Sequence, residues 1–184
     1  MRALLAAVGV LAVVFAGVWE TGRIRERIRE RMRRERSARV LKTIRAIDAL
    51  ASLGSPRLQE IEKVLHFHFV MPHPPEDLRA WEGWTGADEP ISGAKYLALR
   101  SGERPPYQAA LVLDIRRDAM PSLTETRGGL GQADDSRIQC GTLGTGEAVT
   151  EWDYDRPWGT MGLWLSYFES DRRRGLTRAM FFFR

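Results

Sequence analysis

Hydrophobic and polar positions follow three successive patterns along this chain of 184 residues. The first pattern is an uninterrupted apolar run, residues 3–19, which contains no ionisable side chain. Because a helix rises about 1.5 Å per residue, these seventeen residues would cover roughly 26 Å, near the short end of what crosses a bilayer. We therefore predict that the run forms a single-pass membrane anchor.

A cleaved secretory signal peptide is the alternative for this apolar run. Such a peptide combines a basic start, here Arg2, with an apolar core and a small-residue cleavage site, and residues 14–16 would serve as that site. The next segment favours an uncleaved anchor, because residues 20–36 contain eight arginines against four glutamates. Basic residues beside an apolar segment tend to stay in the cytoplasm, so we expect a bacterial inner-membrane protein with its globular part inside.

The second pattern is a narrow apolar stripe within this arginine-rich segment. Ile24, Ile28 and Met32 recur every fourth residue, which predicts a helix with one apolar edge. Two interpretations remain open: a helix for self-association or for a partner, and a solvated stalk whose second half packs on the globular domain. The alternating basic side chains are expected to contact anionic lipid headgroups; they are Arg23, Arg25, Arg27, Arg29, Arg31 and Arg33.

Charge is concentrated beside the anchor. The net charge is +4, and Arg2 with residues 20–36 carries +5, so the rest of the chain sums to about −1. A nucleic-acid-binding domain is expected to carry a basic face with interleaved aromatic residues. The rest of this chain is nearly neutral, which argues against that class. The single cysteine, Cys140, excludes an internal disulfide.

Two helices are predicted before the strands. Apolar positions 40, 41, 44, 47 and 50 form the face of the first helix, and Gly54 is a typical residue to end it. The second helix is expected to have Ser55 as its N-cap and Pro56 in its first turn, with its apolar stripe at positions 58, 61, 64 and 65. Residues 71–93 are rich in proline and glycine and predict a loop held to the core by Trp81 and Trp84.

The third pattern is alternation with a period of two, which predicts strands. Residues 96–100 and 108–116 are expected to form one hairpin, and residues 163–168 and 176–183 a second, while the glycine-rich residues 117–135 predict a mobile surface loop. The predicted class is α+β: a transmembrane helix and a long basic helix, then one or two helices packed on an antiparallel sheet. The expected parts are an anchor (1–20), a basic linker helix (21–53) and a globular domain (54–184).

A weak internal repeat is indicated by two similar segments. Residues 55–59 are expected to open a helix before the first hairpin, and residues 136–139 a short helix before the second, giving two helix–hairpin units about eighty residues apart. This order of elements over residues 40–184 loosely resembles BamE-like and β-lactamase-inhibitor-like small domains. Those families bind proteins and are not enzymes, so the resemblance implies a binding role.

Two clusters of side chains could support chemistry. His66, His68 and His73 are the only histidines; on a strand the first two would share a face, a spacing used by zinc sites, with His73 as a third ligand. They could equally form the polar side of an amphipathic strand. Carboxylates at positions 151, 153 and 155 would share one face of a predicted strand and could bind a cation or act as acid and base, or form a solvated face; they are Glu151, Asp153 and Asp155.

No motif in the chain defines a catalytic or cofactor-binding site, and we expect no cofactor. The leading hypothesis is a non-enzymatic protein-interaction or accessory module held at the membrane. Its expected partners are membrane lipids, through residues 3–19 and the flanking arginines, and an unidentified protein. The alternative is a secreted or periplasmic metal-binding or hydrolytic domain that uses the histidine or the carboxylate cluster.

Overall fold

The computed structural model describes residues 2–54, 56–70, 79–86, 89–98, 107–140, 148–168 and 173–184, and it describes no side chain before residue 24. Its helices are α1 (Arg2–Leu53), α2 (Leu58–Leu65), α3 (Leu123–Leu130) and the 3-10 turn η1 (Arg117–Ala119). Its strands are β1 (Arg79–Trp84), β2 (Ile91–Ala98), β3 (Ala109–Ile115), β4 (Asp135–Cys140), β5 (Ala148–Arg156), β6 (Gly159–Phe168) and β7 (Arg173–Phe183). The chain divides into two compact units, Met1–Ala38 and Arg39–Arg184, and the second is called the folded unit below.

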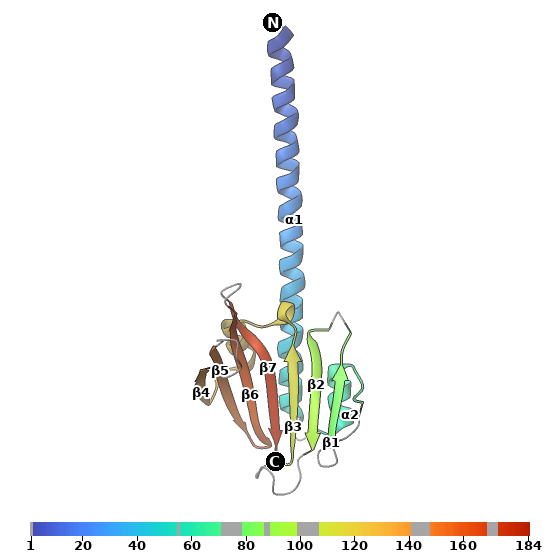
Figure 1. The fold of residues 1–184 in the computed structure, drawn as a ribbon, viewed down its shortest axis with the longest axis vertical. Coiled ribbons are helices and arrows are strands. Elements are labelled where there is room, and N and C mark those ends of the chain that lie inside the picture. Colours follow the sequence, from blue (N-terminus) through green and yellow to red (C-terminus); the bar gives the residue numbers. More distant parts are fainter. Residues whose placement is uncertain are drawn as a thin grey trace. The chain divides into compact units, whose positions relative to one another are not determined.

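The folded unit contains a seven-stranded antiparallel sheet in the order β1-β2-β3-β7-β6-β5-β4 (Figure 1). Two meanders, β1-β2-β3 and β4-β5-β6-β7, join where β3 pairs with β7, with Leu111 opposite Phe181. Both predicted hairpins are confirmed: β2 pairs with β3, and β6 pairs with β7. The α+β class is therefore correct, and the two meanders share one sheet.

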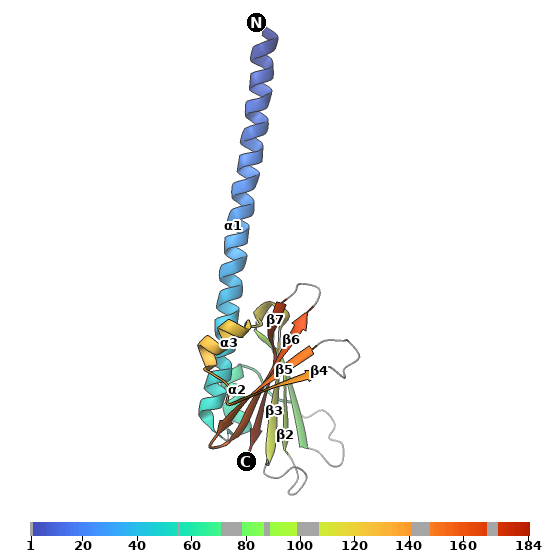
Figure 2. The ribbon, with the colours of Figure 1, turned by 90° about the vertical axis from the view of Figure 1, so that its left-hand side faces the viewer.

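The end of α1, together with α2 and α3, covers one face of the sheet (Figure 2). The last part of α1 supplies the predicted apolar face, since Ile47 and Leu50 are fully buried. Thr43, also fully buried in this helix, donates a hydrogen bond from Oγ1 to the carbonyl oxygen of Ala119 at 3.0 Å. The end of α1 is thus a core element, and it is opposed by alternate side chains of the central strands: Leu111, Leu113, Leu163, Leu165, Ala179 and Phe181.

Helix α3 corrects the prediction of a mobile loop at residues 117–135. Ser122 and Glu125 form a capping box, in which the Ser122 N–H donates to Glu125 Oε2 at 2.7 Å and the Glu125 N–H donates to Ser122 Oγ at 3.3 Å. A Cβ on Gly129 would lie 2.3 Å from Ile44 Cγ2, so glycine allows α3 to approach α1 closely. One of the glycines that indicated a loop, Gly129, thus serves as a packing contact between two helices.

Other local predictions were also wrong, because pairing with distant strands outweighed local signals. Residues 79–84 were expected in a loop, but they form β1, in which Trp81 pairs with Tyr96 of β2. Trp84 is 64% exposed and does not hold this segment to the core. The predicted short helix at residues 136–139 is part of β4, so the helix before the second meander is α3 instead.

The ends of the first two helices agree only partly with the prediction. Gly54 follows α1 with φ at +79°, a conformation that favours glycine, so the predicted helix end is confirmed. Helix α2 has Arg57 in its N-cap position, and the backbone N–H of that residue donates to Glu60 Oε2 at 2.7 Å. The predicted start of this helix, with Ser55 as N-cap and Pro56 as the first helical residue, is therefore wrong, because both residues precede Arg57; Ser55 itself lies outside the described residues.

The membrane prediction concerns a segment whose side chains are not described. Within the described part of the chain, no helix is both long enough and apolar enough to cross a membrane. The apolar run, residues 3–19, lies outside the residues with described side chains, although its backbone belongs to α1. The anchor therefore stays a prediction.

Candidate functional site

Two hollows in the described part of the folded unit are candidate binding sites, and they lie on opposite sides of the sheet. The first, called the helix pocket, lies between α1, α2 and the start of β2 and has a volume of about 290 Å³. The second, called the acidic groove, lies over β4, β5 and β6 on the side of the sheet away from the helices and has a volume of about 580 Å³.

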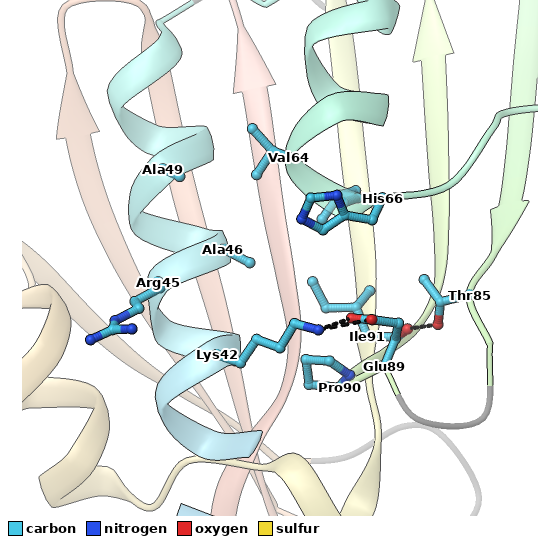
Figure 3. Close-up of a pocket in the computed structure, with 11 residues that line it drawn as sticks. Lys42, Arg45, Ala46, Ala49, Val64, His66, Thr85, Glu89, Pro90 and Ile91 are labelled. Atoms are coloured by element: carbon cyan, nitrogen blue, oxygen red, sulfur yellow. Dashed lines mark hydrogen bonds and ion pairs between the residues drawn. The ribbon is translucent and has the colours of Figure 1, made fainter. Parts of the chain in front are cut away.

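The helix pocket exists because α1 presents small side chains to α2. Residues 42, 46 and 49 are spaced by four and three, so they lie on one face of the helix. Two of them, Ala46 and Ala49, leave a gap that Val64 of α2 and Ile91 of β2 close on the other side (Figure 3). The floor of the pocket is therefore apolar.

The rim of the helix pocket is charged. Lys42 Nζ lies 2.8 Å from Glu89 Oε1 and 2.6 Å from Glu89 Oε2, and this ion pair borders one side (Figure 3). His66 follows α2 with φ at +56°, and its ring projects toward α1 between Val64 and Ile91. An ammonium group and an imidazole thus border an apolar floor.

The acidic groove gathers the carboxylates of two paired strands. Asp135 of β4 lies opposite Asp153 of β5, and Arg137 Nε is 2.9 Å from Asp135 Oδ2 and 4.0 Å from Asp153 Oδ2. Aromatic side chains form the other wall, which consists of Tyr107 and Phe182 with ring centroids 5.4 Å apart. With Asp155 also in the lining, three carboxylates face one arginine, so the groove carries net negative charge.

Two carboxylates of the groove have shifted pKa values. Burial, followed by the negative charge of Glu151, raises the pKa of Asp153 above its usual value, while Arg137 opposes the shift. The hydrogen bond from Arg137 lowers the pKa of Asp135. The two aspartates that face each other across β4 and β5 therefore differ in proton affinity.

The raised pKa of Asp153 predicts how stability depends on pH. The folded state holds this proton more tightly than the unfolded state, so ionised Asp153 destabilises the fold at neutral pH, and the destabilisation fades as pH falls through the raised pKa. We expect Asp153→Asn to increase the free energy of unfolding at neutral pH, with the gain shrinking toward about pH 4. Urea unfolding at both pH values measures this. The matched control, Asp155→Asn on the same strand face, removes an exposed carboxylate and should change stability little; equal gains from both variants would contradict the assignment.

The histidines do not lie on a strand as predicted. His66 caps α2, and His68 follows it with a side chain that is 93% exposed and Nδ1 3.7 Å from Glu62 Oε1. His73 lies outside the described residues. Among the residues that the structure describes, no group of three or more histidine, cysteine or acidic side chains is arranged to hold a metal ion. A zinc site with all three histidines therefore stays a prediction.

The carboxylates at 151, 153 and 155 share one strand face, as predicted. They alternate with Trp152 and Tyr154, which are buried on the helix side. Glu151 Oε1 accepts a hydrogen bond from Trp164 Nε1 at 3.0 Å, whereas Asp153 and Asp155 line the acidic groove. Sequence reasoning missed the contribution of β4 and, apart from His66, the residues of the helix pocket, because strand pairing and helix packing bring those residues together from distant positions.

The chain was compared with protein-family models, with curated proteins and with solved structures. No family model, no curated protein and no solved structure matches it. These comparisons therefore give no support to the resemblance in element order to BamE-like and β-lactamase-inhibitor-like domains.

Proposed function

We infer that this protein is a single-pass membrane-anchored protein whose folded unit is a non-enzymatic protein-interaction or accessory module. The observation that supports the anchor best is the apolar run 3–19, which contains no ionisable side chain and lies at the beginning of α1. One helix, Arg2–Leu53, contains the apolar run 3–19 and also supplies Ile47 and Leu50 to the core. If the beginning of α1 is inserted in a membrane, the folded unit is tethered there, because the end of the same helix is part of its core.

The arginine-rich part of α1 suits the membrane surface. Ile24, Ile28 and Met32 are all more than half exposed, so this stripe remains open for contact. Arginines that directly follow a membrane-spanning run favour the headgroup region, where each basic residue contributes about 1 kcal/mol with anionic lipids. We propose that Arg23, Arg25, Arg27, Arg29, Arg31 and Arg33 contact lipid headgroups on the cytoplasmic side.

An exposed aromatic side chain supports the interaction role of the folded unit. Trp84 on edge strand β1 is 64% exposed, and Val70, which pairs with Glu82 of the same strand, is 60% exposed. Tryptophan is enriched where proteins bind one another, and two large apolar side chains at one sheet edge form a surface that a partner protein would cover.

The anchor is tested by placing charge in the apolar run. Each acidic residue at the centre of a membrane helix costs about 3 kcal/mol of insertion free energy, so we expect the double variant Leu11→Asp/Val14→Asp to leave the membrane fraction. Ultracentrifugation of lysed cells after an alkaline carbonate wash measures the partition. The matched control, Leu11→Ile/Val14→Leu, keeps the run apolar and should remain with the membrane.

Two results would contradict the proposed tether. A wild-type chain that the alkaline wash releases is not a membrane-spanning protein. An intact mass equal to that of a chain starting at Gly17 would show that the apolar run is a cleaved signal peptide. A C-terminal reporter that is active only inside the cell would support the proposed cytoplasmic side, and one active only outside would overturn it.

A further inference from the structure

The helix pocket combines an apolar floor with a positioned cation. Its lining includes six apolar residues, among them Ala46, Ala49 and Ile91, and its volume is about 290 Å³. A water molecule occupies roughly 30 Å³ in the liquid, so this space suits a ligand of fewer than about ten non-hydrogen atoms. The volume lies at the lower limit for ligand sites in proteins, which favours a small molecule.

The ion pair at the rim determines which charge a ligand should carry. Both oxygens of Glu89 already face the ammonium group of Lys42, at 2.8 and 2.6 Å. A lysine ammonium has three donor hydrogens, so Lys42 keeps at least one for a ligand, whereas a cationic ligand would have to displace Lys42 from Glu89. Glu89 therefore holds Lys42 in place as a donor.

A second donor group lies at the rim. The imidazole of His66 borders the pocket, and its ring has no hydrogen-bond partner within the part of the chain that the structure describes. Arg45 also belongs to the lining, but its guanidinium points away from the floor (Figure 3), so Lys42 is the cation that a ligand over the described floor would meet.

We propose that the helix pocket binds a small organic carboxylate with an apolar body, such as a short-chain fatty acid. The apolar body lies over Ala46 and Ala49, and the carboxylate accepts hydrogen bonds from Lys42 and His66. This binding is independent of the proposed membrane tether, because every residue involved belongs to the folded unit. For a ligand of this size the expected Kd is about 1 mM.

The first test compares three ligands of one shape on the wild-type chain. The full chain in detergent is titrated with hexanoate, with neutral hexanamide and with hexylammonium, and the amide NMR shifts of Ala46, Ala49 and His66 are followed. We expect saturable shifts with hexanoate and at least tenfold weaker binding of the other two, since only the carboxylate can use Lys42. Equal binding of hexanamide, tighter binding of hexylammonium, or no saturable shift up to about 20 mM hexanoate would overturn the proposal.

The second test removes the cation and has a matched control. Lys42→Met keeps the apolar stem but not the charge, and it should weaken hexanoate at least tenfold with little effect on hexanamide. Lys95→Met is the control, because Lys95 forms a similar ion pair with Glu82 on another part of the surface. The shortest nitrogen–oxygen distance is 2.6 Å in both pairs, and the lysine side chains are 57% exposed at Lys95 and 50% exposed at Lys42. The carboxylate partners are also similar, with side chains 23% exposed at Glu82 and 28% exposed at Glu89. An equal loss in both variants, or none in Lys42→Met, would overturn the proposal.

A third variant guards against a general effect of losing Lys42. Ala46→Leu fills the floor of the pocket and leaves the ion pair in place. It should abolish binding of hexanoate and hexanamide alike, while the remaining amide spectrum stays that of a folded chain. If hexanoate still binds this variant with wild-type affinity, the ligand lies elsewhere and the assignment to the helix pocket is wrong.

Discussion

Replacing Phe181 by alanine is expected to lower the free energy of unfolding by about 3–5 kcal/mol. Phe181 lies on central strand β7, is fully buried, and faces the helices opposite Leu111. The centroid of its ring lies 6.3 Å from that of Phe183 and 6.2 Å from that of Trp158, and both pairs are stacked. Alanine would therefore leave a cavity bordered by rigid aromatic rings, which we expect to fill it poorly. Urea unfolding of the full chain in detergent, followed by tryptophan fluorescence, measures the loss.

The neighbouring residue provides the matched control for this substitution. Phe182 is also a phenylalanine on β7, but it faces the other side of the sheet, is only half-buried, and contacts Tyr107 at 5.4 Å. Phe182→Ala should therefore lower the free energy of unfolding by less, about 1–2 kcal/mol. If Phe182→Ala costs as much as Phe181→Ala, the inward and outward faces of β7 have been assigned incorrectly.

Local periodicity was sufficient to predict the inward faces of the first two helices and the positions of the central strands. Alternation predicted strands at residues 108–116 and 176–183, which are β3 and β7 in the structure, but it did not say which face of each strand is buried. Helical spacing predicted Ile47 and Ile61 as core residues of α1 and α2, and both are fully buried. The helix predictions hold because a helix with one apolar face has only one way to remove that face from water.

Elements that depend on distant pairing could not be read from local pattern. Strand β1 forms because Trp81 and Glu82 find partners in β2, although proline and glycine on both sides indicate a loop. Helix α3 forms because Ser122 and Glu125 cap it and α1 supports it, despite two internal glycines. In both cases tertiary contacts outweigh intrinsic propensity, which spans only about 1 kcal/mol per residue.

The candidate sites show the same division between local and distant information. The shared face of Asp153 and Asp155 follows from alternation within one strand and was predicted. The pairing of Lys42 with Glu89 joins a helix to the turn before β2, forty-seven positions apart, and no local pattern indicates it. Sequence therefore predicted Asp153 and Asp155 of the acidic groove and only His66 of the helix pocket, where it was proposed as a metal ligand, because the pocket is defined by what α1 leaves unfilled against other elements.

A second large effect is expected at Gly159, where the turn after β5 enters β6. Its φ is +150°, and a Cβ at this position would lie 1.8 Å from the backbone oxygen of Phe182 on the neighbouring strand. An alanine would have to shift backbone that is held on both sides, because Arg184 N–H donates to the Trp158 carbonyl at 2.9 Å. Backbone strain and overpacking each contribute about 1–3 kcal/mol, so we expect Gly159→Ala to lower the free energy of unfolding by about 2–5 kcal/mol.

Gly128 is the matched control, because it receives the same methyl group without a clash. A Cβ on Gly128 would have no atom within 4 Å, and the residue lies inside α3, where alanine is favoured over glycine by about 1 kcal/mol. Gly128→Ala should therefore leave stability unchanged or raise it, in the same urea unfolding experiment. If Gly159→Ala unfolds at the urea concentration of the wild-type chain, the backbone of Phe182 does not lie close enough to Gly159 to exclude a Cβ, contrary to the expected separation of 1.8 Å between that Cβ and the Phe182 oxygen. Since this contact fixes the register of the pair Gly159 and Phe183, it would also place the inward assignment of Phe181 in doubt.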